Sequence, residues 1–95
     1  MKDMPKSPVS KMLDKHSDLT HSTDVKVVSH VQRQQDDWYV NTIMIDGISV
    51  PFIYKRKKPY RSLIGARVNL TYYPTSKQVA GFEMEMMKVV RIRVA

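Results

Sequence analysis

The sequence contains no cysteine, only three glycines and no long apolar run. The absence of cysteine excludes disulfide scaffolds, thiol catalysis and zinc–thiolate sites, and it favours a reducing compartment. Three glycines do not make a glycine-rich phosphate loop. Without about 18 consecutive apolar residues, or the apolar stretch of a signal peptide, we expect neither a membrane span nor export. We therefore expect a cytoplasmic protein that makes no membrane contact.

The length of 95 residues leaves room for one small domain. Hydrophobic residues make up 42% and charged residues 26% of the chain, which is an ordinary globular mixture. Residues 1–24 balance four bases against four acids, include Pro5 and Pro8, and carry few apolar side chains. Such a segment buries too little surface to offset the entropy lost on ordering. We expect a flexible N-terminal tail over residues 1–24 and a folded domain over residues 25–95.

Acidic residues are missing from one long window of the chain. Sixteen Lys and Arg residues oppose nine Asp and Glu residues, which gives a net charge of +7. Between Asp46 and Glu83 there is no acid, and seven bases in that window equal the whole excess. Charge concentrated in this way focuses a positive potential on one surface, which favours an anionic partner.

From Val25 onward apolar and polar residues alternate with a period of two, which predicts β-strands. Residues 38–46 are rich in the β-branched and aromatic side chains that suit a pleated surface. Further strands are expected after residue 47, over residues 67–73 and over residues 82–94. Five strands in about 70 residues need closure to hide their edges, so we expect a small antiparallel barrel.

Asp46-Gly47 is the strongest local signal, and it predicts a two-residue type I′ hairpin turn. The register that follows pairs Ile45 with Ile48, Ile43 with Val50, Asn41 with Phe52 and Tyr39 with Tyr54. Paired residues share a face, so these eight form the inner side of the hairpin. Trp38 then stands opposite Lys55 on the outer side. Pro51 falls where its missing amide points to an unpaired edge.

The C-terminal third continues the alternation with one interruption. Val68, Leu70 and Tyr72 share one face of the predicted fourth strand, and Pro74 starts a loop that runs to Gly81. Lys88 falls out of phase in the last strand, which indicates a bulge or bend there. The expected inner residues of that strand are Met84, Met86, Val90, Ile92 and Val94.

The segment Leu63-Ile64-Gly65-Ala66-Arg67-Val68-Asn69-Leu70 resembles the entry to the fourth strand of OB-fold domains. There, a glycine precedes a strand that alternates basic and apolar residues. As a strand pattern the resemblance covers residues 25–94, and it implies an OB-like barrel. The connection over residues 56–66 departs from the OB pattern because it is short and shows no helical pattern. An SH3-like barrel is the alternative.

The sequence supplies little for catalysis or for a cofactor. The predicted barrel holds one histidine, His30, in mid-strand, where a sheet-face role is expected and no triad can form. Asp36 and Asp37 are adjacent in a turn, and adjacent side chains diverge. His16 and His21 lie five residues apart in the predicted tail and match no recognised metal site. We expect a protein that is not an enzyme and has no cofactor and no metal.

The sequence has more of the residues needed to bind single-stranded RNA or DNA than of those needed for catalysis. That task needs cations that follow the phosphates and exposed rings on which bases stack. A basic run around Tyr60 and several outward cations of the last strands fit this need. The candidate nucleic-acid-binding residues are Trp38, Lys55, Arg56, Lys57, Lys58, Tyr60, Arg61, Arg67, Tyr73, Arg91 and Arg93.

The alternative is a protein-interaction or assembly module. The outer side of the predicted hairpin carries Trp38, Val40, Met44 and Ile53, which would form an exposed apolar strip. The strand edge left open at Pro51 would accept a partner strand. The basic run would then contact an acidic protein partner, and we expect a monomer or a weak homodimer.

Overall fold

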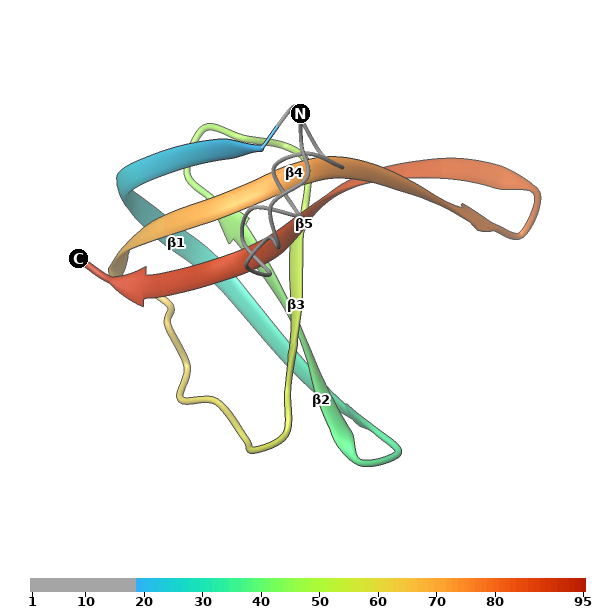
Figure 1. The fold of residues 1–95 in the computed structure, drawn as a ribbon, viewed down its shortest axis with the longest axis horizontal. Coiled ribbons are helices and arrows are strands. Elements are labelled where there is room, and N and C mark those ends of the chain that lie inside the picture. Colours follow the sequence, from blue (N-terminus) through green and yellow to red (C-terminus); the bar gives the residue numbers. More distant parts are fainter. Residues whose placement is uncertain (1–18) are drawn as a thin grey trace, which may run out of the picture.

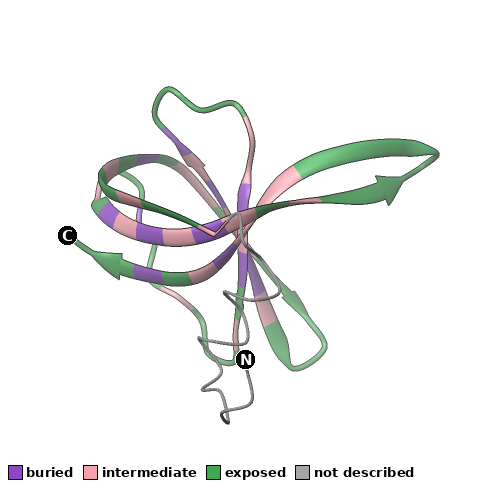
Figure 2. Cartoon of the chain, turned by 45° about the horizontal axis from the view of Figure 1, so that its top comes forward, coloured by how far each residue is buried: buried purple, intermediate pink, exposed green. Residues whose placement is uncertain are grey.

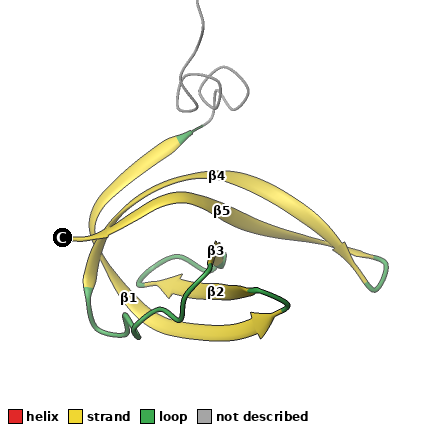
Figure 3. Cartoon of the chain, turned by 60° about the horizontal axis from the view of Figure 1, so that its bottom comes forward, coloured by secondary structure: helices red, strands yellow, loops and turns green. Residues whose placement is uncertain are grey.

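Five β-strands make up the fold (Figure 1). A computed structural model describes residues 19–95, and this part of the chain contains strands and turns but no helix. The strands are β1 (Thr20–Gln35), β2 (Trp38–Ile45), β3 (Phe52–Arg56), β4 (Arg67–Val79) and β5 (Phe82–Val94). They close into a barrel in the order β1-β2-β3-β5-β4, with β4 paired to β1 (Figure 3). The predicted all-β class and five-stranded barrel are confirmed.

One pair of neighbouring strands runs parallel, against the expectation of a purely antiparallel barrel. Four of the five pairs are antiparallel, and β3 pairs with β5 in parallel. Antiparallel neighbours alternate in direction, so a closed ring with an odd number of strands must contain a parallel pair. The β3–β5 pairing also fills the edge of β3 near Pro51 that was expected to be open, because the amide of Met87 donates to the Pro51 carbonyl at 2.8 Å.

The first strand begins earlier than the expected domain boundary at residue 25. Thr20 pairs with Tyr72 of β4, so residues 20–24 belong to the barrel, and the remaining part of the predicted tail lies outside the described residues. Two bulges bend β1, one between Ser22 and Val25 and one between Val27 and Ser29. Bulges increase bend and twist, which allows one strand to pair with β4 in its first half and with β2 in its second.

The hairpin of β2 and β3 keeps its predicted faces but not its predicted register. Ile43 stands opposite Phe52 and Asn41 opposite Tyr54, which shifts the pairing by two residues. A shift of two leaves the paired residues of β2 and β3 on their predicted faces, but Ile48, which was expected inside, lies before β3 and is exposed. Only Gly47 of the turn has a positive φ, at 84°, so the turn is not type I′. The Ile48 amide still donates to the Ile45 carbonyl at 3.0 Å, but the pairing of β2 with β3 resumes only at Ile43 and Phe52, so the connection is longer than two residues.

The last two strands form an arm that extends beyond the barrel (Figure 1). The expected loop between Pro74 and Gly81 is wrong: β4 continues to Val79, which pairs with Phe82. The turn between them has positive φ at both Ala80 and Gly81, 51° and 83°, as a type I′ hairpin requires. Among the described residues, Pro74 pairs only with Met87 of β5, and proline is tolerated at such a strand edge.

Buried residues occur on all five strands (Figure 2), and together they form the core of the barrel. Its largest fully buried members are Tyr54, Phe52 and Ile43, and the Phe52 and Tyr72 rings meet edge to face at 4.8 Å. In β5 the buried residues are Val89 and Ile92, three apart, because a bulge at Val90 interrupts the ladder between Thr71 and Tyr72. The bulge was expected at Lys88.

The bulge also corrects the expected inner face of the last strand. Ile92 is buried as expected, but Val89 takes the place of Val90 in the core. Met84 is 49% exposed and Val94 is 64% exposed, so neither belongs to the core. Before the bulge the two faces of β5 are therefore exchanged relative to the predicted alternation.

Replacement of Tyr54 by Phe tests the core directly. The Tyr54 hydroxyl is buried and has no hydrogen-bond partner among residues 19–95, so Tyr54→Phe should raise the free energy of unfolding by about 1 kcal/mol. Tyr72→Phe is the matched control: its hydroxyl lies 2.8 Å from Ser22 Oγ, and its loss should lower stability by about 1 kcal/mol. Urea unfolding at neutral pH measures both. A Tyr54→Phe protein as destabilised as the control would contradict this account.

The same hydroxyl predicts a pH dependence. Burial, with a smaller contribution from Tyr60, raises the pKa of Tyr54 above its ordinary value. The unfolded chain releases the phenolic proton at about pH 10 while the folded chain keeps it, so this group lowers stability as pH rises above about 10. The loss should be smaller in Tyr54→Phe when thermal unfolding is followed from neutral to strongly alkaline pH. Equal losses in both proteins would show that Tyr54 ionises freely in the folded state.

Candidate nucleic-acid interface

A basic groove crosses the outer side of the barrel. It has a volume of about 480 Å³, and its lining includes four bases and no acid. Every strand contributes to it. The lining residues are Arg33 and Gln35 of β1, Val40 and Thr42 of β2, Ile53 and Lys55 of β3, Tyr73, Thr75, Ser76 and Lys77 of β4, and Met86 and Lys88 of β5.

Cross-strand pairing explains why these residues share one surface. Thr42 pairs with Ile53, Ile53 with Lys88, and Lys88 with Tyr73, which forms one continuous row from β2 to β4. A second row joins Arg33 to Val40 and Val40 to Lys55. Because paired residues lie on the same face, both rows point outward and form the floor of the groove. The ends of the β1–β2 and β4–β5 hairpins flank it.

The only tryptophan of the chain extends this surface. Trp38 pairs with the groove residue Gln35, and its side chain is 40% exposed. The ammonium of Lys57 lies 4.6 Å from the centre of the Trp38 ring. The expected Trp38–Lys55 pair is wrong, because the two-residue register shift places Val40 opposite Lys55. The ring and the cation nevertheless remain neighbours, as a cation–π pair.

Arg56 and Tyr60 turn away from the groove and cover one end of the barrel core. The Arg56 guanidinium lies 5.0 Å from the Tyr54 ring centre and 5.7 Å from that of Tyr60. The Tyr60 ring meets Tyr54 edge to face at 5.5 Å. Gln32 exchanges two 2.7 Å hydrogen bonds with the Tyr60 main chain. Tyr60 is thus a partly buried packing residue rather than an open platform for a base.

His30 binds the connection between β3 and β4 to the barrel through hydrogen bonds. The Leu63 amide donates to His30 Nδ1 at 2.9 Å, so Nε2 carries the proton and donates to Asn41 Oδ1 at 2.8 Å. Asn41 is fully buried, and its amide donates to the Tyr39 carbonyl at 3.3 Å. Both ring nitrogens of His30 are therefore used within the fold. Lys58 and Arg61 are exposed on this connection and do not line the groove.

Arg67, Arg91 and Arg93 lie on the outward face of β4 and β5, beyond the groove. Arg91 and Arg93 line a second hollow of about 300 Å³ together with residues of β1 and β4. Arg67 lies 3.7 Å from the Asp24 carboxylate and also donates to the Asp24 carbonyl at 3.0 Å. Of the predicted site residues, the structure brings Lys55 and Tyr73 together in the groove, with Trp38 and Lys57 beside them.

The groove contains bases that the sequence analysis did not select: Arg33, Lys77 and Lys88. Lys88 interrupts the expected alternation of the last strand, which indicated a bulge at that residue. The alternation alone did not predict that Lys88 lies on the groove face. Lys77 was assigned to a loop that does not exist. Phe82, at the tip of the β4–β5 arm, is 72% exposed and was assigned no role.

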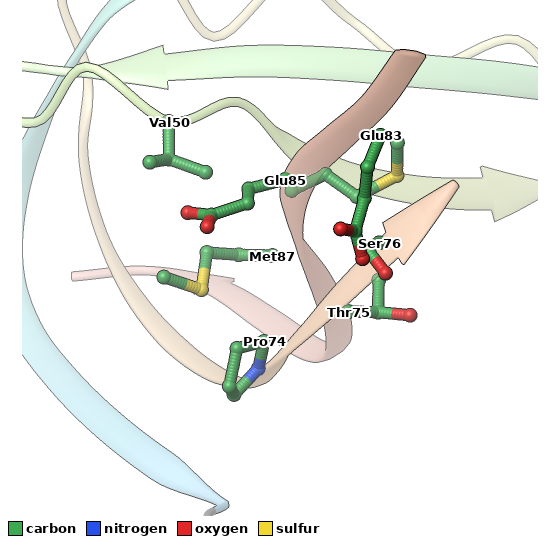
Figure 4. A pocket seen from close by; sticks show the side chains of 8 residues that line it. Val50, Pro74, Thr75, Ser76, Glu83, Glu85 and Met87 are labelled. Atoms are coloured by element: carbon green, nitrogen blue, oxygen red, sulfur yellow. The ribbon is translucent and has the colours of Figure 1, made fainter. Parts of the chain in front are cut away.

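The acids of the β4–β5 arm line another pocket (Figure 4), which shares Thr75, Ser76 and Met86 with the groove. Glu83 and Glu85 line a pocket of about 330 Å³ with Met87, Pro74 and Val50. Glu85 pairs with Ser76, and Glu83 pairs with Gln78. These pairs alternate along the ladder with the pairs that contain Lys77 and Lys88, so their side chains point to the other face. The alternation of the two strands thus separates negative from positive side chains across the arm.

The predicted apolar strip of the alternative hypothesis is not present as expected. Val40 is only 8% exposed, and Met44 and Ile53 are half-buried, which leaves Trp38 as its exposed member. No metal-binding group of three His, Asp or Glu side chains occurs over residues 19–95. Within that range no helix has the length and apolar character needed to cross a membrane. Of the two histidines expected not to form a metal site, His16 lies outside the described residues, and His21 Nδ1 lies 2.9 Å from Thr71 Oγ1.

Comparison with protein-family models, with curated proteins and with solved structures found no match.

Collisional quenching of Trp38 fluorescence tests the local potential without any ligand. Iodide concentrates at positive surfaces, so Lys57→Gln should lower its quenching constant while quenching by neutral acrylamide stays the same. Lys58→Gln removes the same charge from an exposed position outside the groove and should leave both constants unchanged. Equal iodide quenching in all three proteins would contradict the placement of Lys57 against Trp38.

Proposed function

We propose that this protein binds single-stranded nucleic acid, RNA or DNA, along the basic groove. The observation that carries the proposal is the lining itself, which combines four bases with no acid. Single strands are bound without sequence preference by surfaces that pair such a cationic path with aromatic faces. The groove lining includes one ring, Tyr73, and Trp38 lies beside it on the same face.

Different residues of the groove suit different parts of a nucleotide: the phosphate, the base and the sugar. Lys55 pairs with Val40 and Lys88 pairs with Ile53, so each of these two apolar floor residues has a cation beside it on the neighbouring strand for a phosphate. Bases released from stacking in water gain contact with the floor and with the Tyr73 ring. Hydroxyl groups of Thr42 and Thr75 offer donors and acceptors to sugars or base edges.

The strand order supports an OB-like assignment as part of this proposal. OB-fold barrels bind oligonucleotides on the face of their second and third strands, between the loops that follow the first and fourth strands. In this protein the groove floor contains residues of β2 and β3, and the β1–β2 and β4–β5 hairpins flank it. This agreement supports the proposal that the groove binds a single strand.

Binding to an acidic protein is the second candidate. The tip of the β4–β5 arm favours it, because Phe82 is 72% exposed and its partner Val79 is 46% exposed. Apolar side chains at such a position suit a protein contact. β5 pairs with the edge of β3 near Pro51 that was expected to accept a partner strand. The protein-interaction hypothesis therefore loses one of the observations that favoured it.

A salt titration of oligonucleotide binding tests the proposed function. Four phosphate contacts predict a log–log slope of about −2.8, from about −0.7 per contact on a single strand. If those contacts contribute only counterion release, Lys55→Gln/Lys88→Gln should weaken binding about 25-fold at 0.1 M salt and reduce the slope by about 1.4. Fluorescence anisotropy of a labelled oligothymidylate measures both quantities.

The matched control removes two charges from outside the groove. Lys58→Gln/Arg61→Gln should bind nearly as well as the unmodified protein, because neither residue lines the groove. Equal losses in both double variants would show that net charge, not the groove, drives binding. No binding even at low salt would refute the proposal and favour the protein partner.

A further inference from the structure

We infer that a single strand longer than the groove continues onto a second cationic segment, formed by Arg91 and Arg93 on the outward face of β5. This inference rests on the proposed function. It adds to the site a phosphate-binding track that leaves the groove at Lys88 and follows the β4–β5 ribbon around the barrel.

The outward pairs of the β4–β5 ladder carry the argument. Five successive outward pairs run from the arm to the far end of the barrel, and four of them contain one cation and no anion. In order these pairs are Lys77–Met84, Thr75–Met86, Tyr73–Lys88, Thr71–Arg91 and Asn69–Arg93. At about 3.3 Å per residue, the eight steps from Lys77 to Asn69 span about 26 Å.

The bulge at Val90 makes this track continuous. Lys88 and Arg91 are an odd number of residues apart, so an unbroken strand would place them on opposite faces. The ladder skips Val90 between the pairs Tyr72–Val89 and Thr71–Arg91, which returns Arg91 to the face of Lys88. Bulges are known to redirect side chains in this way.

The hollow at Arg91 and Arg93 suits phosphate rather than a base. It measures about 300 Å³, and its other lining residues include His21, Ser22, Thr23 and Thr71, with no acid. No Trp, Tyr or Phe lines it. Guanidinium groups and hydroxyls donate hydrogen bonds to phosphate oxygens, so this segment would add affinity without sequence preference.

Charges around the track define where it ends. Arg67, the next outward residue of β4, is already paired with Asp24 at 3.7 Å. Glu83 and Glu85 alternate with the outward residues Met84 and Met86, so no acid belongs to the outward pairs, although Thr75 and Met86 also line the pocket of the two acids. The usable cations of the ribbon are therefore Lys77, Lys88, Arg91 and Arg93.

The test compares Arg91→Gln/Arg93→Gln with the unmodified protein at two oligonucleotide lengths. Oligothymidylates of about 6 and about 15 nucleotides lie within the range of about 4–16 that one OB barrel covers. The variant should bind the longer strand about 25-fold more weakly at 0.1 M salt, with a slope smaller by about 1.4, and the shorter strand unchanged. Comparing proteins at each length cancels the advantage that a longer strand gains from multiple registers.

The controls separate failure of this inference from failure of the proposed function. Lys58→Gln/Arg61→Gln loses the same charge off the track and should bind both lengths normally. If Lys55→Gln/Lys88→Gln weakens both lengths while Arg91→Gln/Arg93→Gln weakens neither, the groove binds and the track does not. If the arginine variant weakens both lengths equally, the effect is not an extension of the groove. If the unmodified protein binds neither length, the proposed function itself fails.

Discussion

Paired residues on neighbouring strands share a face, and this constraint organises the whole molecule. Closing five strands into a ring forces one parallel pair, which brings β5 beside β3 and makes a continuous outer surface from β1 to β4. The inner face of that ring is apolar, and Tyr54, Phe52 and Ile43 fill it. The other side chains of the strands point outward. The face on which a charged side chain lies therefore depends on whether its position along the strand is odd or even.

Alternation along the strands concentrates positive side chains on one surface of the molecule. The β4–β5 arm holds Lys77 and Lys88 on one face and Glu83 and Glu85 on the other. Had both acids shared the face of the lysines, they would offset two of the four positive charges that line the groove. A thin ribbon with opposite charges on its two faces is a simple means of presenting one side to a polyanion while the net charge stays low.

The sequence predicted the class of fold and most of the hairpin interior because alternation survives a register shift of two. Ile43, Ile45, Phe52 and Tyr54 are buried as expected, although their partners differ. Features that depend on tertiary partners were not predictable. The β2–β3 ladder resumes only at Ile43 and Phe52, and Pro74 continues a strand that, among the described residues, pairs at that point with β5 alone.

The candidate site was predicted in part for the same reason. Lys55, Tyr73 and Trp38 were selected from their outward parity, and the structure places them on one surface. Arg56 and Tyr60 were selected from the basic run, but packing against Tyr54 draws both to the end of the barrel. A bulge cannot be located from alternation alone, and its true position at Val90 decides which face Lys88 joins.

The most direct measurement is a map of amide chemical-shift changes as an unlabelled oligothymidylate is added to the isotope-labelled protein at low salt. The account predicts that changes concentrate on the groove residues of β2, β3 and β5, including Val40, Lys55 and Lys88, with Glu83 and Arg61 unaffected. Changes centred on the acidic face of the arm or on the β3–β4 connection would contradict it, as would a spectrum that does not respond at all.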